Sequence, residues 1–204
     1  MHDLPRLFTG QELSSDEYLE DFYPRFWEIS EGDFWKLERI QSFQEDGSDS
    51  WDAFDRGEWD ESFRLIEERR ESLAEYYAQV AHSGFTTYRV RVVEEDVTPY
   101  LRWQLRSLCQ RSELGERIRV VGPDAVGPFE RDGSLPEIVT LGTHAVYQVL
   151  YSHDGALRGA VRSDRPEDVS SWREFIEGLY AVGEEIGDFC DRRAASLEPP
   201  RGLS

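Results

Sequence analysis

Lysine is almost absent from this chain of 204 residues: of its 23 basic residues only Lys36 is a lysine, and the rest are arginines. Schiff-base chemistry and phosphate-binding loops both depend on a lysine at a defined place, so the sequence argues against both kinds of site. The chain has only two cysteines, Cys109 and Cys190, on predicted helices far apart. We expect both to be reduced, because a structural disulfide is unusual in the cytoplasm.

Several other signals are missing. There is no apolar run of the ~18 residues that a membrane span needs, and the opening residues do not form a signal peptide; we therefore predict a soluble cytoplasmic protein. No glycine-rich dinucleotide motif and no nucleophile elbow is present. The four histidines and two cysteines show no zinc-like spacing. The prediction is no metal, no cofactor and no catalytic residue, which favours a protein that is not an enzyme without deciding the question.

Acidic residues dominate what is present. The net charge is −19, and residues 1–84 carry 22 acidic and 8 basic side chains, a net charge of −14. Such a surface repels nucleic acid and anionic membranes and attracts basic partners. Direct nucleic-acid or membrane binding is therefore not expected, whereas a basic protein partner is. The alternative is that the charge serves solubility alone.

The clearest structural pattern lies between Phe85 and Val121. In residues 86–93, tyrosine and valines alternate with arginines, which is typical of a half-buried strand. Thr98 and Pro99 then predict a helix start, and Gly115 its end. Residues 117–121 form a second arginine-containing strand. Strand, helix and strand with short connections predict a βαβ unit with parallel strands.

This unit supplies the candidate ligand site. If the two strands are neighbours, we expect their four arginines to lie on one face of the sheet, where they form an anion site. The alternative is that acidic helices cover this face and neutralise it through internal ion pairs. Ligands of open parallel sheets bind beyond the carboxyl ends of the strands. The predicted ligand-binding residues are Arg89, Arg91, Glu94, Tyr100, Trp103, Arg117 and Arg119.

The remaining elements are predicted from periodicity. Residues 34–39 are ambiguous between strand and helix, and a long helix is expected from Asp60 to about Ala81. Three further strands are predicted at 137–141, 145–151 and 157–162, with a hairpin turn at 153–155, followed by a last helix over about 167–186.

The predicted fold is α/β or α+β, with a mixed sheet of four to six strands built on the central βαβ unit and flanked by three main helices. Residues 34–190 are expected to form one domain. An acidic, aromatic N-terminal arm (1–33) should pack on it, since exposing so many aromatic side chains to water is unfavourable. Residues 191–204 are predicted to be a flexible tail.

The sequence resembles an uncharacterised actinobacterial family, domain of unknown function DUF6879, over roughly residues 30–190. The similar stretches are Phe-Trp-Lys-Leu-Glu-Arg (34–39), Ser-Trp-Asp-Ala-Phe (50–54), Arg-Val-Arg-Val-Val-Glu (89–94), Thr-Pro-Tyr-Leu-Arg-Trp-Gln-Leu (98–105), Gly-Glu-Arg-Ile-Arg-Val-Val (115–121) and Leu-Pro-Glu (135–137). The resemblance implies no known activity. Members are often encoded beside helix-turn-helix regulators, which implies a regulatory partnership.

A fainter likeness, in shape only, is to half of a phospholipase D-type domain. That superfamily needs a His-x-Lys pair, but Ala145 and Val146 follow His144, and no lysine follows Lys36. A related fold would therefore lack the catalytic motif.

Two functions follow as hypotheses. The first is a non-catalytic regulatory protein that binds another protein, plausibly a basic helix-turn-helix regulator. The second is a sensor or enzyme for a small anionic ligand, which uses an arginine-lined cleft at the strand ends.

Overall fold

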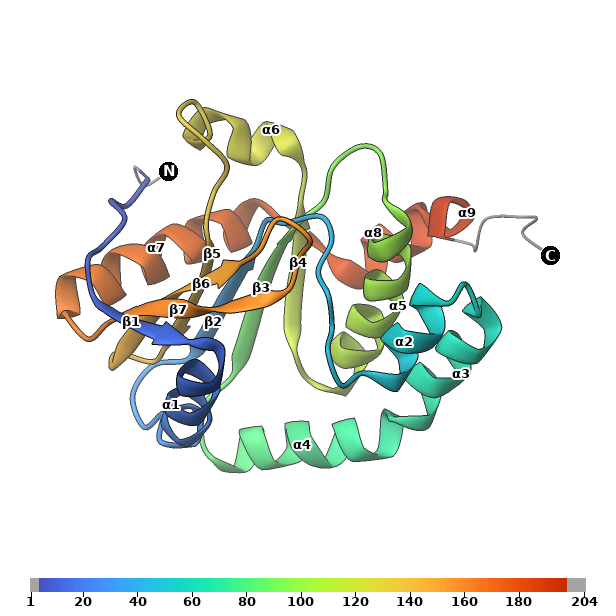
Figure 1. Ribbon diagram of the computed structural model, residues 1–204, viewed down its shortest axis with the longest axis horizontal. Helices are drawn as coiled ribbons and strands as arrows, with labels where there is room; N and C mark the ends of the chain where they lie inside the picture. Colours follow the sequence, from blue (N-terminus) through green and yellow to red (C-terminus); the bar gives the residue numbers. More distant parts are fainter. Residues whose placement is uncertain (1–3, 198–204) are drawn as a thin grey trace.

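The computed structural model describes residues 4–197, which build one mixed eight-stranded sheet in the order β1-β7-β6-β5-β2-β3-β4-β8. The strands are β1 (Gln11–Ser14), β2 (Phe34–Glu38), β3 (Thr87–Val92), β4 (Arg117–Val121), β5 (Glu137–Leu141), β6 (Ala145–Tyr151), β7 (Leu157–Ser163) and β8 (Glu184–Glu185). The helices are α1 (Ser15–Trp27), α2 (Asp49–Asp55), α3 (Trp59–Glu68), α4 (Arg70–His82), α5 (Pro99–Leu114), α6 (Pro123–Val126), the 3-10 helix η1 (Gly127–Phe129), α7 (Pro166–Val182), α8 (Ile186–Arg192) and α9 (Ala194–Leu197). Figure 1 shows the sheet at the centre of the molecule with helices around it.

The central βαβ unit is confirmed. β3 and β4 pair in parallel, and α5 connects them. The Thr98 hydroxyl accepts a hydrogen bond from the Leu101 amide at 3.1 Å, and Pro99 occupies the first turn. Gly115 ends the helix with φ at 136°, a conformation that side chains rarely adopt. Local signals therefore set both ends of α5.

Residues 34–39, which the sequence left ambiguous between strand and helix, supply the central strand β2. Strand β2 pairs in parallel with β3 and antiparallel with β5, so it joins the two halves. β5, β6 and β7 follow as an antiparallel meander, and the turn predicted at 153–155 connects β6 to β7. The mixed α/β class is thus confirmed.

The sheet has eight strands rather than the four to six expected, and more helices surround it than the three main ones predicted. The additional strands are the short edges β1 and β8, of four and two residues. β1 pairs with β7 where Gly159 leaves room for it: a Cβ there would lie 2.0 Å from the Leu13 carbonyl oxygen. Ser14 then caps α1 in a capping box with Glu17.

Two helix predictions were wrong. The helix expected from Asp60 to Ala81 is divided at Arg69 into α3 and α4, and neither a proline nor a glycine accounts for the break. The last helix stops at Val182, because Gly183 packs against the backbone of β4 and β8 follows at once.

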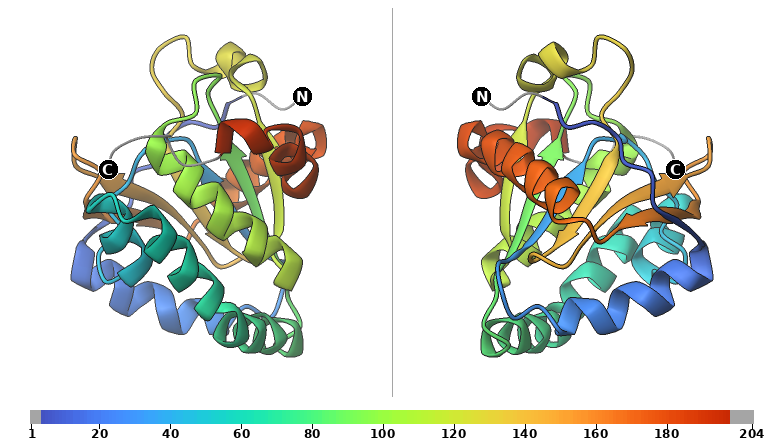
Figure 2. Two further views of the ribbon diagram at one scale, coloured as in Figure 1. Left: turned by 90° about the vertical axis from the view of Figure 1, so that its right-hand side faces the viewer. Right: turned by 90° about the vertical axis from the view of Figure 1, so that its left-hand side faces the viewer.

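One face of the sheet is covered by α7. Trp172, Phe175, Ile176 and Leu179 pack there against Leu37, Val90, Val92, Ile138 and Val146. Figure 2 shows this helix alone on its side, with the other large helices across the sheet. The valines of β3 therefore point to α7, as their alternation predicts.

Two separate groups of helices cover the second face. α5 and α8 cover β4 with an apolar cluster that includes Leu105 and Ile118, while α1 covers β5, β6 and β7 with Tyr18 and Phe26. α4 runs along the open end between them (Figures 1 and 2). On this second face, the middle of the sheet, which is β2 and the first half of β3, is thus left without a helix.

The cysteines are not reduced as expected: a disulfide joins Cys109 of α5 to Cys190 of α8. It ties together two helices that pack on the same part of the sheet. In residues 4–197, no helix is both long and apolar enough to cross a membrane.

Candidate functional site

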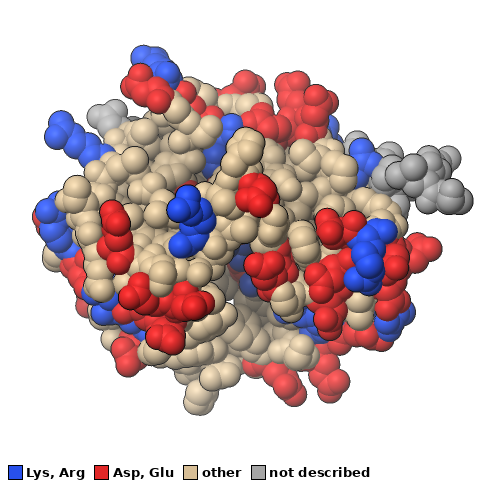
Figure 3. Space-filling model, in the orientation of Figure 1, with Lys and Arg blue, Asp and Glu red and all other residues tan. Residues whose placement is uncertain are grey.

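The uncovered middle of the sheet is the floor of a cleft of about 520 Å³. Figure 3 shows the surface hollowed there, above α4. Its walls come from α1, α4, α5 and the segment that leads into α2. The volume is in the range of cavities that hold small organic molecules.

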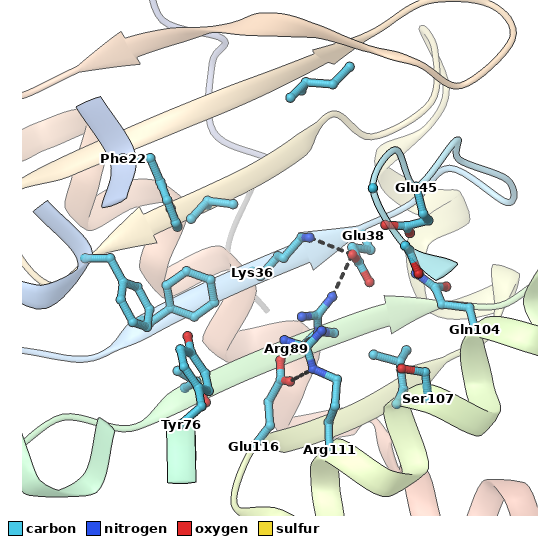
Figure 4. A pocket seen from close by; sticks show the side chains of 18 of the residues that line it. Phe22, Lys36, Glu38, Glu45, Tyr76, Arg89, Gln104, Ser107, Arg111 and Glu116 are labelled. Carbon is cyan, nitrogen blue, oxygen red and sulfur yellow. Dashed lines mark hydrogen bonds and ion pairs between the residues drawn. The ribbon is translucent and has the colours of Figure 1, made fainter. Parts of the chain in front are cut away.

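A chain of five charged side chains crosses the floor (Figure 4). The Lys36 ammonium lies 2.7 Å from Oε1 of Glu38, and Nη1 of Arg89 lies 2.6 Å from the same oxygen. Arg89 also donates from Nε to Glu116 at 2.7 Å, and Arg111 donates from Nε to the other oxygen of Glu116 at 2.8 Å. Positive and negative groups therefore alternate, and a cation stands at each end.

The arrangement follows from the strands. Lys36 of β2 and Arg89 of β3 are direct neighbours in the parallel register. Glu38 lies on the same face as Lys36, because side chains two residues apart share a face. Glu116 stands just before β4, and Arg111 lies in the last turn of α5. Sequence-distant elements thus place the five groups in one line.

The three central members are buried: Glu38, Arg89 and Glu116 are 3%, 5% and 2% exposed. Burial alone raises the pKa of Glu38, but the charges of Arg89 and Lys36 outweigh it and bring this pKa well below its ordinary value. Burial likewise acts against ionisation of Glu116, yet Arg111 and Arg89 lower its pKa to about 2. Both carboxylates are therefore ionised at neutral pH.

Tyr77 of α4 completes this end of the floor. Its hydroxyl donates to Oε2 of Glu116 at 2.6 Å and accepts from Nε of Arg111 at 2.9 Å. Among residues 4–197, Arg111 donates hydrogen bonds only from Nε, and its side chain is 32% exposed. The terminal nitrogens of Arg111 and the ammonium of Lys36 thus remain to interact with a ligand.

One wall of the cleft is aromatic. Phe22 lies edge-on to Phe34 at 6.3 Å, and Phe26 stacks on Tyr76 at 6.2 Å between ring centroids. At the mouth, Tyr23 is 59% exposed, and it is one of the few large apolar side chains left in water. Rings in this arrangement favour a planar apolar group.

The opposite wall is polar. It is lined by Gln104 and Ser107 of α5 together with Glu45, Asp46 and Ser48, which precede α2, and Figure 4 shows Gln104 beside Glu45. Glu45 accepts a hydrogen bond from the Tyr100 hydroxyl at 2.5 Å. This wall therefore offers oxygen acceptors and an amide, in contrast to the aromatic side.

Three buried polar atoms of the lining have no hydrogen-bond partner among the described residues: Oε2 of Glu38, Oγ1 of Thr87 and Nε1 of Trp103. Unpaired buried polar atoms are uncommon and costly.

Another unpaired oxygen, Oε2 of Glu137, lies outside the lining of the cleft. The other carboxylate oxygen of Glu137 accepts from the backbone amides of Arg39 and Ile40, at 2.7 and 2.6 Å. Burial, and then the negative charge of Glu38, raise the pKa of Glu137 to about 7. Unlike the floor carboxylates, this group titrates near neutrality.

The four arginines of the predicted site do not share a face, and this expectation was wrong. The strands pair Tyr88 with Arg117 and Arg89 with Ile118, so the two Arg-x-Arg patterns are out of register by one residue. A shift of one residue moves a side chain to the other face of a sheet. Arg119 accordingly stacks on Tyr180 of α7 at 4.6 Å and pairs with Glu185 at 2.7 Å.

Of the seven predicted residues, the structure places only Arg89 and Trp103 in the lining of the cleft. Arg91 is fully buried behind it and donates to Gln104 and to the backbone carbonyls of residues 38, 40 and 92. The Tyr100 hydroxyl donates a hydrogen bond to Glu45 of the lining. Glu94 lies outside the cleft and pairs with Arg39 at 2.6 Å. Arg117 is exposed at the start of β4.

Sequence reasoning missed Lys36, Glu38, Tyr77, Arg111 and Glu116. One signal was available: Lys36 is the single lysine of a chain that otherwise uses arginine. Alternation of polar and apolar residues over positions 34–38 also indicated a strand with a polar face. The remaining members come from loops and helix ends, which carry no such pattern.

The comparisons place the chain in a family. A model described as a domain of unknown function, DUF6879, matches residues 20–191. The chain belongs to the DUF6879 family. Searches of curated proteins and of solved structures each found no match. The DUF6879 match spans α1 to α8 and so includes every residue of the cleft floor.

Within the described part of this DUF6879 chain, no group of three or more histidine, cysteine, aspartate or glutamate side chains is placed to hold a metal ion.

Proposed function

We propose that the protein binds a small organic molecule in this cleft, and that the molecule carries an acidic group and a planar apolar part. The observation that carries the proposal is the charged chain on the floor, with a cation at each end, beside an aromatic wall (Figure 4). An acidic group receives hydrogen bonds from Lys36 and the terminal nitrogens of Arg111. The ring lies between Phe22, Phe34 and Tyr76.

The burial of the floor supports binding over a purely structural role. Ion pairs inside a protein gain little stability over apolar packing, because both charges lose their water. A fold that needed only stability has no use for four of them on an open cavity. Charges held rigidly by one another do provide a preorganised polar surface for a ligand.

Titration calorimetry with 3-phenylpropionate and phenyl phosphate tests the proposal. We expect saturable binding that Lys36→Gln weakens about tenfold, the effect of losing one charge-assisted hydrogen bond. The matched control is Arg64→Gln, which removes one positive charge from the exposed side of α3 and should leave binding unchanged. Absence of binding by the wild-type protein at millimolar concentration, both to these compounds and to aromatic acids that carry a further polar group, refutes the proposal.

A second candidate function is regulation through a basic protein partner, such as a helix-turn-helix regulator. Acidic side chains gather over α2 and α3 in Figure 3, and Asp49, Asp52 and Asp55 of α2 form no salt bridge within residues 4–197. Unneutralised carboxylates on one surface speed and orient the association of a basic protein. Neutralising the three to asparagine should abolish recovery of one dominant basic partner in a pull-down at low salt. Equal recovery by this variant and by the wild type refutes this candidate.

A further inference from the structure

The charged residues that line the cleft balance one another. Four are basic (Lys36, Arg69, Arg89 and Arg111) and four are acidic (Glu38, Glu45, Asp46 and Glu116). A ligand with only an acidic group therefore brings an uncompensated charge into a neutral cavity, beside four carboxylates. A ligand with one positive and one negative group keeps the balance.

The apolar and acidic parts of the lining lie at opposite ends of the cleft. Figure 4 shows Phe22 and Tyr76 on one side of Lys36, and Glu45 with Gln104 on the other, beyond Glu38. The paired charges of the floor lie between these two ends. The cleft thus has an aromatic end, a charge-paired middle whose outer members are Lys36 and Arg111, and an acidic end at Glu45.

Glu45 gives this acidic end an acceptor, since Tyr100 occupies only its Oε1. Glu38 lies next to it and adds a second negative charge through Oε1, the oxygen that Lys36 and Arg89 share. An ammonium group is stabilised where it can donate to such carboxylate oxygens.

We infer that the ligand is a zwitterion of the aromatic amino-acid class, as the free amino acid or a short peptide that carries it. Its ring lies against Phe22, Phe34 and Tyr76, its carboxylate faces Lys36 and Arg111, and its ammonium donates to Glu38 and Glu45. This inference rests on the proposed function and adds the ammonium group to it.

The test compares three probes that differ in one group each. L-phenylalanine carries both charges, 3-phenylpropionate lacks the ammonium, and phenethylamine lacks the carboxylate; tyrosine and tryptophan extend the ring. Calorimetry should show an L-phenylalanine affinity at least tenfold above that of either single-charge probe. Equal or tighter binding of 3-phenylpropionate overturns the inference and leaves the proposed function standing. Binding of none of the three at millimolar concentration overturns both.

Glu45→Gln provides the matched variant, because glutamine keeps an acceptor for Tyr100 and removes the charge. We expect about tenfold weaker binding of L-phenylalanine and less than twofold change for 3-phenylpropionate. The control, Asp55→Asn, removes one negative charge from the exposed end of α2, outside the cleft, and should change neither affinity. A Glu45→Gln variant that binds L-phenylalanine as the wild type does contradicts the position assigned to the ammonium.

Discussion

Glu116→Gln is the substitution that most directly tests the charged floor. Glu116 accepts hydrogen bonds from Arg89, Arg111 and Tyr77 and is only 2% exposed. A glutamine amide has one oxygen and one NH₂ group, so one of the two arginines meets a donor instead of an acceptor. Arg89 keeps Glu38 as its remaining counter-ion.

Removing one partner of a buried ion pair costs about 3–5 kcal/mol. Since Arg89 keeps a second carboxylate, we expect a loss near the lower limit, about 3 kcal/mol of unfolding free energy. For a domain of this size that corresponds to a decrease in Tm of about 6–12 °C. Urea unfolding followed by tryptophan fluorescence at pH 7 measures the change.

Glu113→Gln is the control. Glu113 pairs with Arg70 at the surface, where its side chain is 60% exposed, and its loss should cost less than about 0.5 kcal/mol. The pH dependence gives a second check. The pKa of Glu116 is lowered to about 2 in the folded protein. Its contribution to the free energy of unfolding is therefore fully present above pH 4.5 and is lost as the pH falls towards 2. A Glu116→Gln variant as stable as the wild type at pH 7 refutes the assignment of these ion pairs.

Three further predictions concern the surrounding fold. The pKa of Glu137 is raised to about 7, so its contribution to the free energy of unfolding is most favourable below pH 4.5 and is lost as the pH rises through 7. Glu137→Gln should therefore stabilise the protein by about 2–4 kcal/mol at pH 8 and by far less at pH 5. Equal changes in stability at both pH values, measured by urea unfolding, contradict this prediction. Cys190→Ser removes the disulfide with Cys109, which closes a loop of 81 residues, and should lower the free energy of unfolding by about 2–5 kcal/mol. A reducing agent should lower the Tm of the wild type but not that of the variant. Gly159→Ala brings a Cβ against the β1 backbone and should lower the free energy of unfolding by about 2–4 kcal/mol. Its control is Gly187→Ala, where a Cβ meets no atom within 4 Å and should not destabilise the protein. Equal Tm values for these two alanine variants exclude the close β1–β7 contact.

The parts of the fold that were predictable are those specified by neighbouring residues. Thr98, Pro99 and Gly115 act on the helix that contains or borders them, and each was found where its local chemistry requires. The strands β5, β6 and β7 likewise agree with their alternation. Edge strands β1 and β8 are too short to show a period, and they form because a partner strand stands beside them.

The cleft was not predictable, because it depends on register and on long-range contacts. Whether Arg119 faces Arg89 or α7 is decided by a single residue of offset between two similar strands. The floor joins residues 36, 38, 89, 111 and 116, whose separations along the chain follow no motif. The disulfide was unpredictable for the same reason, since Cys109 and Cys190 are 81 residues apart along the chain and only the folded sheet brings α5 and α8 together.

The single lysine makes the floor chemically addressable without any mutation. Reductive methylation with ¹³C-formaldehyde would label one side-chain amine in the whole protein, that of Lys36, together with the terminal amine. In a carbon–proton correlation spectrum, the Lys36 signal would carry the effect of the buried carboxylate that lies 2.7 Å from its nitrogen. The scarcity of lysine would thus give the cleft its own spectroscopic probe, one that reports on ligand occupancy in the unmutated protein.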